Sequence, residues 1–219
     1  KILNASLVSG AVVLFWVINA WSLPMAGDTV KMNTSWGDNY GMKILNSSNP
    51  MTIDDLYNTF CVEKNETFNN NGIYTVESVG TVATLGGSNN GLPGVDPLTG
   101  KPGDPISEES RWLYASFFDG VFDSIASGQT LVDKVQNAIW FSEDEISSSS
   151  DYSTFIALAG GDFTLTGWNI KVVNIVNTVN QNNRQSQLVG TPVPEPVTLA
   201  LFGMGLIGLA GFGRKKINS

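Results

Sequence analysis

The sequence predicts an α+β fold that is mainly β, sandwich-like or barrel-like, with a two-helix insertion. Strand-like runs occupy residues 51–85 and recur in 152–190, while residues 107–145 switch to helical spacing. Strands, then helices, then strands again are typical of this class. We expect an N-terminal signal peptide over residues 1–26, an exported globular domain over 27–190 and a C-terminal sorting segment over 191–219.

The first half of the globular domain favours strands. Residues 27–50 are polar with scattered aromatic side chains and predict one or two strands with loops. Two further strands are expected at Leu56–Val62 and Gly72–Leu85, because the second run is β-branched and lies between Gly- and Asn-rich turn signals. Residues 86–106 are rich in Gly and Pro and predict an exposed loop.

Two helices are expected next. Ser107 followed by two glutamates is typical of a helix start, since acids in the first turn complement the helix dipole. A second helix is predicted to start near Thr130, with Asp133 as a capping-box-like acid. We read Ser147–Ser150 as a linker or hairpin loop and residues 152–190 as strands. The helix positions expected to face the core are Trp112, Leu113, Phe117, Val121 and Ile125, then Val132, Val135, Ile139 and Trp140.

Composition excludes several classes of function. The 219 residues include no histidine and one cysteine, so His-based triads, His-ligated zinc, internal disulfides and cysteine metal clusters are excluded. Between residues 27 and 192 there are eight basic and nineteen acidic residues, a formal charge of −11. Such a surface argues against nucleic-acid binding. We expect a protein that is not an enzyme and has neither a cofactor nor a metal site.

The N-terminus has the layout of a secretory signal peptide. Lys1 precedes the apolar run Leu7–Ile18, and small or helix-breaking residues follow at Ala20, Pro24 and Ala26. The run is too short to span a bilayer comfortably. Export through the Sec translocon is therefore the prediction, and a buried element or a true membrane anchor are the alternatives.

The C-terminus combines an extended segment, an apolar helix and a basic end. Val193-Pro-Glu-Pro196 is followed by sixteen uncharged residues, 197–212. As a helix they would measure about 24 Å, slightly less than a hydrocarbon core of about 30 Å, and snorkelling cations can cover the difference. The basic residues Arg214, Lys215 and Lys216 would hold this end in the cytoplasm. The alternative is a buried core helix.

These three parts, in this order, resemble the PEP-CTERM protein-sorting signal. The resemblance implies a Gram-negative, exopolysaccharide-producing bacterium and processing by an exosortase, with Pro194, Glu195 and Pro196 as the recognition element. It also implies an anchored precursor in the inner membrane that later reaches the cell surface or extracellular matrix. Another label for such tails is ice-binding protein C-terminal domain. Ice binding would need repeated Thr-x-Thr, which occurs once, at Thr164-Leu-Thr166.

The single cysteine is the residue with the most distinctive chemistry. Asn58-Thr-Phe-Cys-Val-Glu63, together with Val135-Gln-Asn-Ala-Ile-Trp140, resembles the thioester domains of bacterial surface adhesins. The resemblance implies that the Cys61 thiol condenses with the Gln136 amide, although Val135 replaces the threonine of that pattern. Alternatively, Cys61 is a small buried hydrophobic residue and the second stretch is a helix that packs its tryptophan.

Clustered acids offer other chemistries. Glu143, Asp144 and Glu145 beside Ser147–Asp151 could ligate Ca²⁺, and two of Asp54, Asp55, Glu63 and Glu66 could form a glycosidase pair. Solvated acidic faces explain both groups better. Aromatic residues could stack on sugars, but their spacing favours core positions for most of them: Trp36, Tyr40, Trp112, Tyr114, Trp140 and Trp168.

The sequence therefore predicts a non-enzymatic, exported surface or matrix protein associated with exopolysaccharide or biofilm. An adhesin with a Cys61–Gln136 thioester is the alternative, and a carboxylate-based enzyme acting on polysaccharide is a third.

Overall fold

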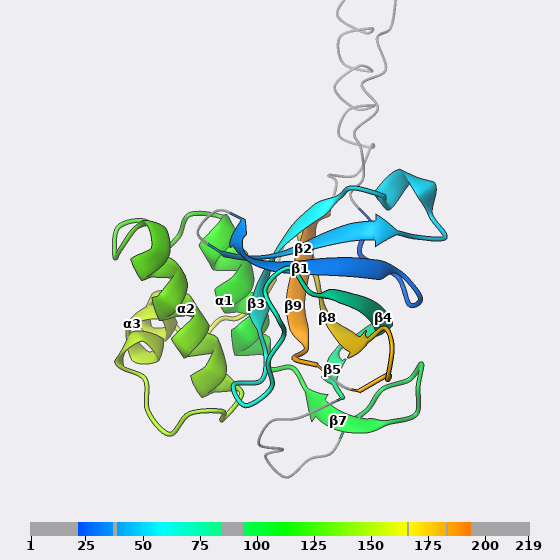
Figure 1. Ribbon diagram of the computed structural model, residues 1–219. Coiled ribbons are helices and arrows are strands. Elements are labelled where there is room, and N and C mark those ends of the chain that lie inside the picture. The colour runs from blue at the N-terminus through cyan, green and yellow to red at the C-terminus, as the bar shows by residue number, and fades with distance from the viewer. Residues whose placement is uncertain (1–21, 37–38, 85–93, 166, 183, 194–219) are drawn as a thin grey trace, which may run out of the picture.

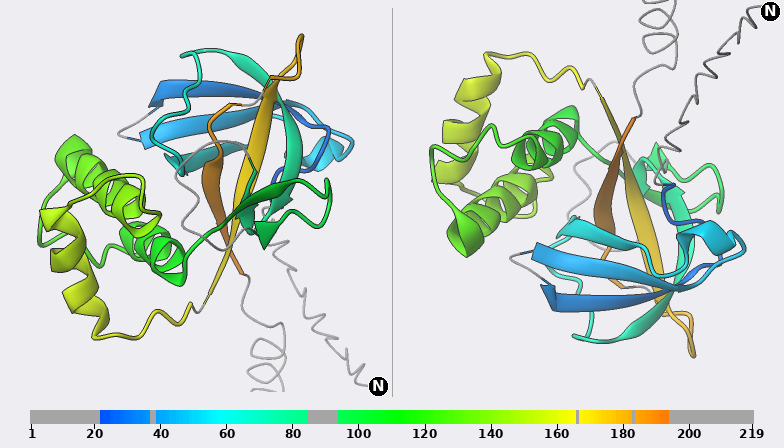
Figure 2. Two further views of the ribbon diagram at one scale, coloured as in Figure 1. Left: turned by 90° about the horizontal axis from the view of Figure 1, so that it is seen from below. Right: turned by 90° about the horizontal axis from the view of Figure 1, so that it is seen from above.

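The structure is a computed structural model that describes residues 22–36, 39–84, 94–165, 167–182 and 184–193. Within these ranges, six antiparallel strands close into a barrel in the order β1-β2-β3-β9-β8-β4. Three α-helices form a layer on one flank of the barrel (Figures 1 and 2). The α+β class is confirmed, as a barrel and not a sandwich. The barrel strands are β1 (Thr29–Trp36), β2 (Asn39–Asn46), β3 (Leu56–Cys61), β4 (Ile73–Gly80), β8 (Trp168–Asn177) and β9 (Gln187–Pro192).

The barrel interior is apolar because alternate side chains of each strand point inward. On β4, Tyr74 and Val76 are buried, while Ile73 and Thr75 are more exposed. A single cluster fills the barrel: Val30, Met32, Met42, Ile44, Tyr57, Tyr74, Val76, Val173, Ile175 and Val189.

The wall formed by β3, β9 and β8 is buried on both faces. Val173 and Val189 point into the barrel core, whereas Val172, Leu188 and Phe60 belong to a second core beneath the helices. Because both faces are covered, every residue of β8 from Val172 to Val176 is buried, and all of them except Asn174 are apolar. This shared wall positions the candidate site.

The helices α1 (Glu108–Phe118), α2 (Gly128–Ser142) and α3 (Ser150–Ala159) pack on that wall. The predicted start of the first helix is confirmed, since the Ser107 hydroxyl oxygen accepts a hydrogen bond from the Ser110 amide at 3.0 Å. Most of the predicted inward positions are also confirmed. Leu113, Val132, Val135 and Ile139 are buried, and Trp112, Phe117 and Trp140 are half-buried.

The ends of the first two helices differ from the prediction. α1 stops at Phe118, and Gly120 then adopts a left-handed conformation with φ of +74°. The chain turns there, so Val121 is exposed and Phe122 is buried in its place. α2 begins at Gly128, two residues before the predicted start.

The third helix was not predicted, because the serine run before it resembles a linker. In the structure the third of these serines caps the helix: the Ser149 hydroxyl oxygen accepts from the Tyr152 amide at 3.1 Å, and Ser150 begins α3. Phe155 is fully buried and anchors α3, which ends at the left-handed Gly160. The prediction of strand from residue 152 onward was therefore wrong up to the start of β8.

Part of the predicted loop 86–106 forms strands. β6 (Gly94–Val95) and β7 (Pro102–Pro105) pair with each other, and β7 also pairs with β5 (Val82–Ala83). Gly103 is required in β7, because a Cβ there would lie 2.2 Å from the carbonyl oxygen of Ala83.

The predicted transmembrane helix 197–212 and the sorting residues Pro194, Glu195 and Pro196 lie outside the described residues, as do Arg214, Lys215, Lys216 and residues 1–21. Among the helices that are described, none has the length and apolar character needed to cross a bilayer. Residues 22–26 pack against the barrel. The Tyr57 hydroxyl hydrogen-bonds the carbonyl of Ser22, and Leu23 contacts the barrel core.

Candidate functional site

The structure brings Cys61 and Gln136 together. Cys61 is the last residue of β3, and Gln136 projects from α2, 75 residues further along the chain. The Cys61 backbone amide donates to Gln136 Oε1 at 2.8 Å, and Gln136 Nε2 donates to the Cys61 carbonyl at 2.7 Å. Both residues are buried, with exposed fractions of 2% and 4%.

The Gln136 amide occupies the place of a missing strand neighbour. Pairing of β3 with β2 ends at Tyr40 and Thr59. Val62 donates to Ser186 on the β9 side, so the amide and carbonyl of Cys61 point to the opposite side, where β2 no longer pairs with them. The side-chain amide of Gln136 satisfies both groups and thereby joins the helical layer to the barrel wall.

The Cys61 sulfur is held by a second glutamine. Gln187, which lies opposite Cys61 on β9, places Nε2 3.7 Å from Sγ. Thr59 donates its hydroxyl to Gln187 Oε1 at 2.8 Å, which fixes the orientation of that amide. Burial raises the pKa of the Cys61 thiol well above its ordinary value, the Gln187 hydrogen bond lowers it, and Glu63 raises it further. Cys61 is therefore a thiol at neutral pH.

Glu63 lies two residues beyond Cys61 and is 2% exposed. Its Oε2 accepts from the Ser186 amide at 2.7 Å, while its Oε1 is buried with no hydrogen-bond partner in the described part of the chain. Burial raises the pKa of Glu63 to about 7, opposed by the Ser186 hydrogen bonds, and Glu145 raises it slightly more. The expectation of a solvated acid was wrong here, because the end of β3 is covered by both β9 and the helices.

Glu143 is a second buried acid that the sequence placed on a solvated face. It follows α2, and its Oε1 accepts from the Ser107 amide at 3.1 Å and from the Ser107 hydroxyl at 2.5 Å. Its pKa is raised by burial. This carboxyl group ties the end of α2 to the start of α1, which is a structural role.

The four acids of the glycosidase hypothesis lie in two groups at the two ends of β3. Asp54 and Asp55 precede β3 and Glu63 and Glu66 follow it, so a strand of about 17 Å separates the two pairs. A glycosidase pair needs carboxyl groups about 5 to 9.5 Å apart. Among the residues that the structure describes, no group of three or more His, Cys, Asp or Glu side chains could hold a metal ion.

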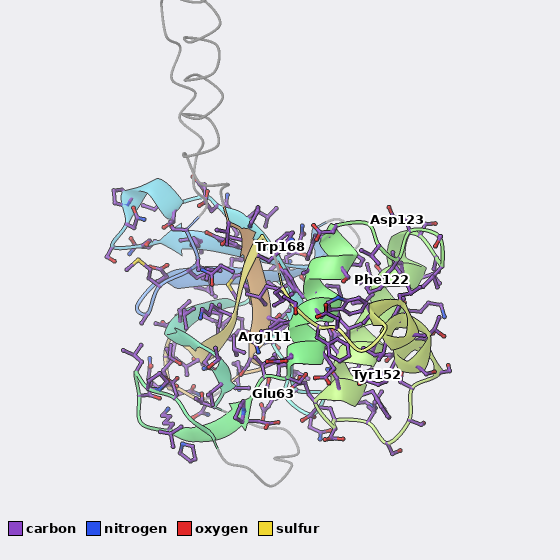
Figure 3. The ribbon with its side chains drawn as sticks, turned by 180° about the vertical axis from the view of Figure 1, so that it is seen from behind. Glu63, Arg111, Phe122, Asp123, Tyr152 and Trp168 are labelled. Atoms are coloured by element: carbon purple, nitrogen blue, oxygen red, sulfur yellow. The ribbon has the colours of Figure 1, made fainter. Side chains whose placement is uncertain are left out.

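An aromatic hollow of about 190 Å³ lies at the other end of the seam between barrel and helices. Figure 3 shows Trp168 and Glu63 near opposite ends of α1. The Trp168 indole donates to Asp119 at 3.0 Å, and Tyr114 is a core residue, as expected. The side chains of Trp36 and Tyr40 lie outside the described part. The hollow is lined by Leu56, Tyr57, Asn58, Tyr114, Phe118, Trp168, Gly190 and Pro192.

Residues 192–215 match the PEP-CTERM protein-sorting motif. The predicted resemblance of the tail is confirmed, and the chain is an exported protein sorted by an exosortase, first membrane-associated and then at the cell surface. No curated protein and no solved structure is significantly similar to the chain.

The sequence located Cys61 and Gln136, and it missed the parts that Glu63 and Gln187 have in this site. Glu63 lies beyond both β3 and the predicted strand Leu56–Val62, so strand alternation could not place its side chain. Gln187 had no sequence signal, because its place opposite Cys61 depends on the pairing of two strands far apart in sequence.

Proposed function

We propose that this protein is a covalent surface adhesin that forms an internal thioester between Cys61 and Gln136. The observation that carries the proposal is the pair of hydrogen bonds, 2.8 and 2.7 Å long, that hold the Gln136 amide against the Cys61 backbone. The resemblance of both short motifs to adhesin thioester domains supports the same pair.

The chemistry is a condensation. The Cys61 sulfur attacks the Gln136 amide carbon, the S–H and C–N bonds break, an S–C bond forms and ammonia leaves. An amide is a poor electrophile, so the reaction needs a held, desolvated geometry. The burial of both residues provides the desolvation.

The Cys61 backbone amide has a second role in this reaction. Its N–H already donates to Gln136 Oε1, the oxygen on which negative charge develops when sulfur attacks. A fixed backbone donor at that oxygen stabilises the tetrahedral intermediate in the manner of an oxyanion hole.

The finished thioester would capture an amine or a hydroxyl on another surface and would be consumed in doing so. The protein is then an adhesin and not an enzyme. We place it in the envelope or exopolysaccharide matrix of a Gram-negative bacterium, where it would take part in a biofilm. The sorting motif and the acidic body, with its formal charge of −11, support that setting.

Intact-mass spectrometry of the full chain, purified in detergent, tests the proposal. The wild-type mass should be lower by one ammonia, about 17 Da, than the mass calculated for its observed termini. The Cys61→Ala and Gln136→Glu variants should show no such deficit. An unmodified wild-type mass, with a Cys61 thiol that reacts with a thiol reagent after denaturation, would mean that Gln136 only pairs the edge of β3.

A further inference from the structure

The aromatic hollow is uncharged, although the domain around it is strongly acidic. None of the residues that line it carries a charge, whereas residues 27–192 have a formal charge of −11. Its rim is apolar and reaches water. Leu56 is 43% exposed, and Val193, which directly follows the lining residue Pro192, is 50% exposed. An exposed apolar surface on an acidic, exported protein indicates a contact with an apolar partner.

The aromatic side chains of the hollow are held in place. Trp168 packs on Phe118 and Tyr114, with ring centroids 5.8 and 6.0 Å apart. Gly190 makes room for Tyr114, because a Cβ there would lie 2.5 Å from Tyr114 Cε1. The Trp168 indole N–H donates to the exposed Asp119 at 3.0 Å. Trp168 therefore combines an apolar body with a polar tip in water, which is how tryptophan lies at membrane–water interfaces.

The C-terminal apolar run joins the globular domain beside this hollow. Trp168 pairs with Pro192 on β9, and both line the hollow. The amide of the next residue, Val193, donates to the carbonyl of Gly167 at 2.8 Å, so the chain is held as far as Val193. The uncharged run 197–212 begins four residues later. Because four residues span at most about 14 Å, the hollow lies close to the surface of any bilayer that takes up this run.

The N-terminal apolar run joins the domain at the same place. Tyr57 also lines the hollow, and its hydroxyl hydrogen-bonds the carbonyl of Ser22, the first described residue. The apolar run Leu7–Ile18 ends four residues before Ser22. Both apolar runs of the chain are therefore attached beside the hollow, and each would bring this face of the domain to a membrane.

We propose that the aromatic hollow and its apolar rim dock the globular domain onto the bilayer while the protein is membrane-associated. The partner is the interface of a zwitterionic lipid bilayer, because the acidic domain would be repelled by an anionic lipid surface. Trp168 lies at the level of the lipid head groups, and Leu56 and Val193 contact the acyl chains. Docking keeps residues 194–196 at the bilayer surface, where an exosortase in the membrane can reach them. The inference is independent of the thioester.

The test measures the fluorescence of Trp168 in the full chain, reconstituted into phosphatidylcholine vesicles. A second set of vesicles contains phosphatidylcholine with a nitroxide near the head group, which quenches tryptophan side chains at the interface. The difference between wild type and Trp168→Phe gives the quenching of Trp168 alone, since the other tryptophans remain in both proteins. We expect Trp168 to lose about half of its fluorescence or more in the nitroxide vesicles.

Two exposed apolar residues provide matched variants. Leu56→Asp places a charge on the rim of the hollow. Val179→Asp places one beyond the end of β8, at the opposite end of that strand from Trp168. Both side chains reach water, with exposed fractions of 43% and 90%, so neither change should unfold the protein. We expect Leu56→Asp to remove most of the quenching, because an unpaired charge disfavours contact with acyl chains, and Val179→Asp to leave it unchanged.

Two results would overturn the proposal. One is equal fluorescence of Trp168 in the two kinds of vesicle, which is the result for a hollow that binds a soluble ligand such as a neutral sugar. The other is quenching that Leu56→Asp leaves unchanged, because the short tether alone would then hold Trp168 near the bilayer. Should Trp168→Phe fail to fold, the total tryptophan quenching of wild type, Leu56→Asp and Val179→Asp decides between the same outcomes.

Discussion

At the scale of single residues, the molecule concentrates its unusual chemistry at the end of one strand. Cys61, Gln136, Glu63 and Gln187 come from β3, the residues that follow it, α2 and β9, and all four are buried. Cys61 contacts both Gln136 and Gln187, and Glu63 accepts from the backbone amide of Ser186, just before β9. Burying four polar side chains so close together costs the fold free energy. Such a cluster therefore favours a chemical role for these residues.

The raised pKa of Glu63 makes a prediction about stability. The folded protein binds a proton at Glu63 up to about pH 7, whereas the unfolded chain releases it near the ordinary value of 4.5. Between these values the native state binds more protons, so stability is highest at the acid end and falls as pH rises. Glu63→Gln should remove this loss, which amounts to about 3 kcal/mol.

The measurement is the free energy of denaturant unfolding from pH 4.5 to 8 for wild type and Glu63→Gln. Glu143 has a pKa raised by burial and remains in both proteins, so its contribution cancels in the difference. Two curves that stay parallel over this range would show that Glu63 titrates normally in the folded state.

At the scale of elements, features that depend on neighbouring residues could be predicted from the sequence. Features that depend on tertiary packing could not. The Ser107 cap and the apolar faces of α1 and α2 follow from helical spacing, and both were predicted. α3 was missed because a run of serines is equally compatible with a linker and with a helix cap, and only the burial of Phe155 decides between them. The burial of Glu63 was missed for the same reason, since the cover over β3 comes from α2 and β9.

Residues 22–26 allow a prediction at the scale of elements. They pack on the barrel, although the predicted signal peptide extends to residue 26. A chain that begins at Gly27 loses the Ser22 carbonyl bonded by Tyr57 and the packing of Leu23. It should unfold with about 2 kcal/mol less free energy than a chain that begins at Ser22. Denaturant titration of the two chains measures this, and equal midpoints would show that the segment contributes nothing to the fold.

At the scale of the whole molecule, the globular domain is followed by a segment that directs the sorting of the protein. The match over residues 192–215 begins at the last residue of β9, so the sorting signal follows the barrel directly. The tail could be identified from the sequence because its three parts, the Pro-Glu-Pro motif, the apolar run and the cations, follow one another directly along the chain. The surface that the proposed adhesin would bind has no such linear signature.

The sorting signal makes a prediction that is independent of the thioester. Glu195→Ala should leave the protein uncleaved in the inner membrane, because an exosortase would lose its recognition element. Immunoblotting of fractionated cells measures precursor and product, with Glu66→Ala as a control for a distant acid. Normal processing of Glu195→Ala would count against exosortase recognition at this site.

The position of Gln136 in the chain also determines how the protein would bear force. A captured target would be attached covalently to α2, whereas the sorting segment follows β9. The covalent path between them runs through α3, β8 and β9 and bypasses β1 to β4 altogether. Pulling would therefore stretch the helical layer and the β8–β9 pair, and the first four strands would feel the load only through their contacts with that pair.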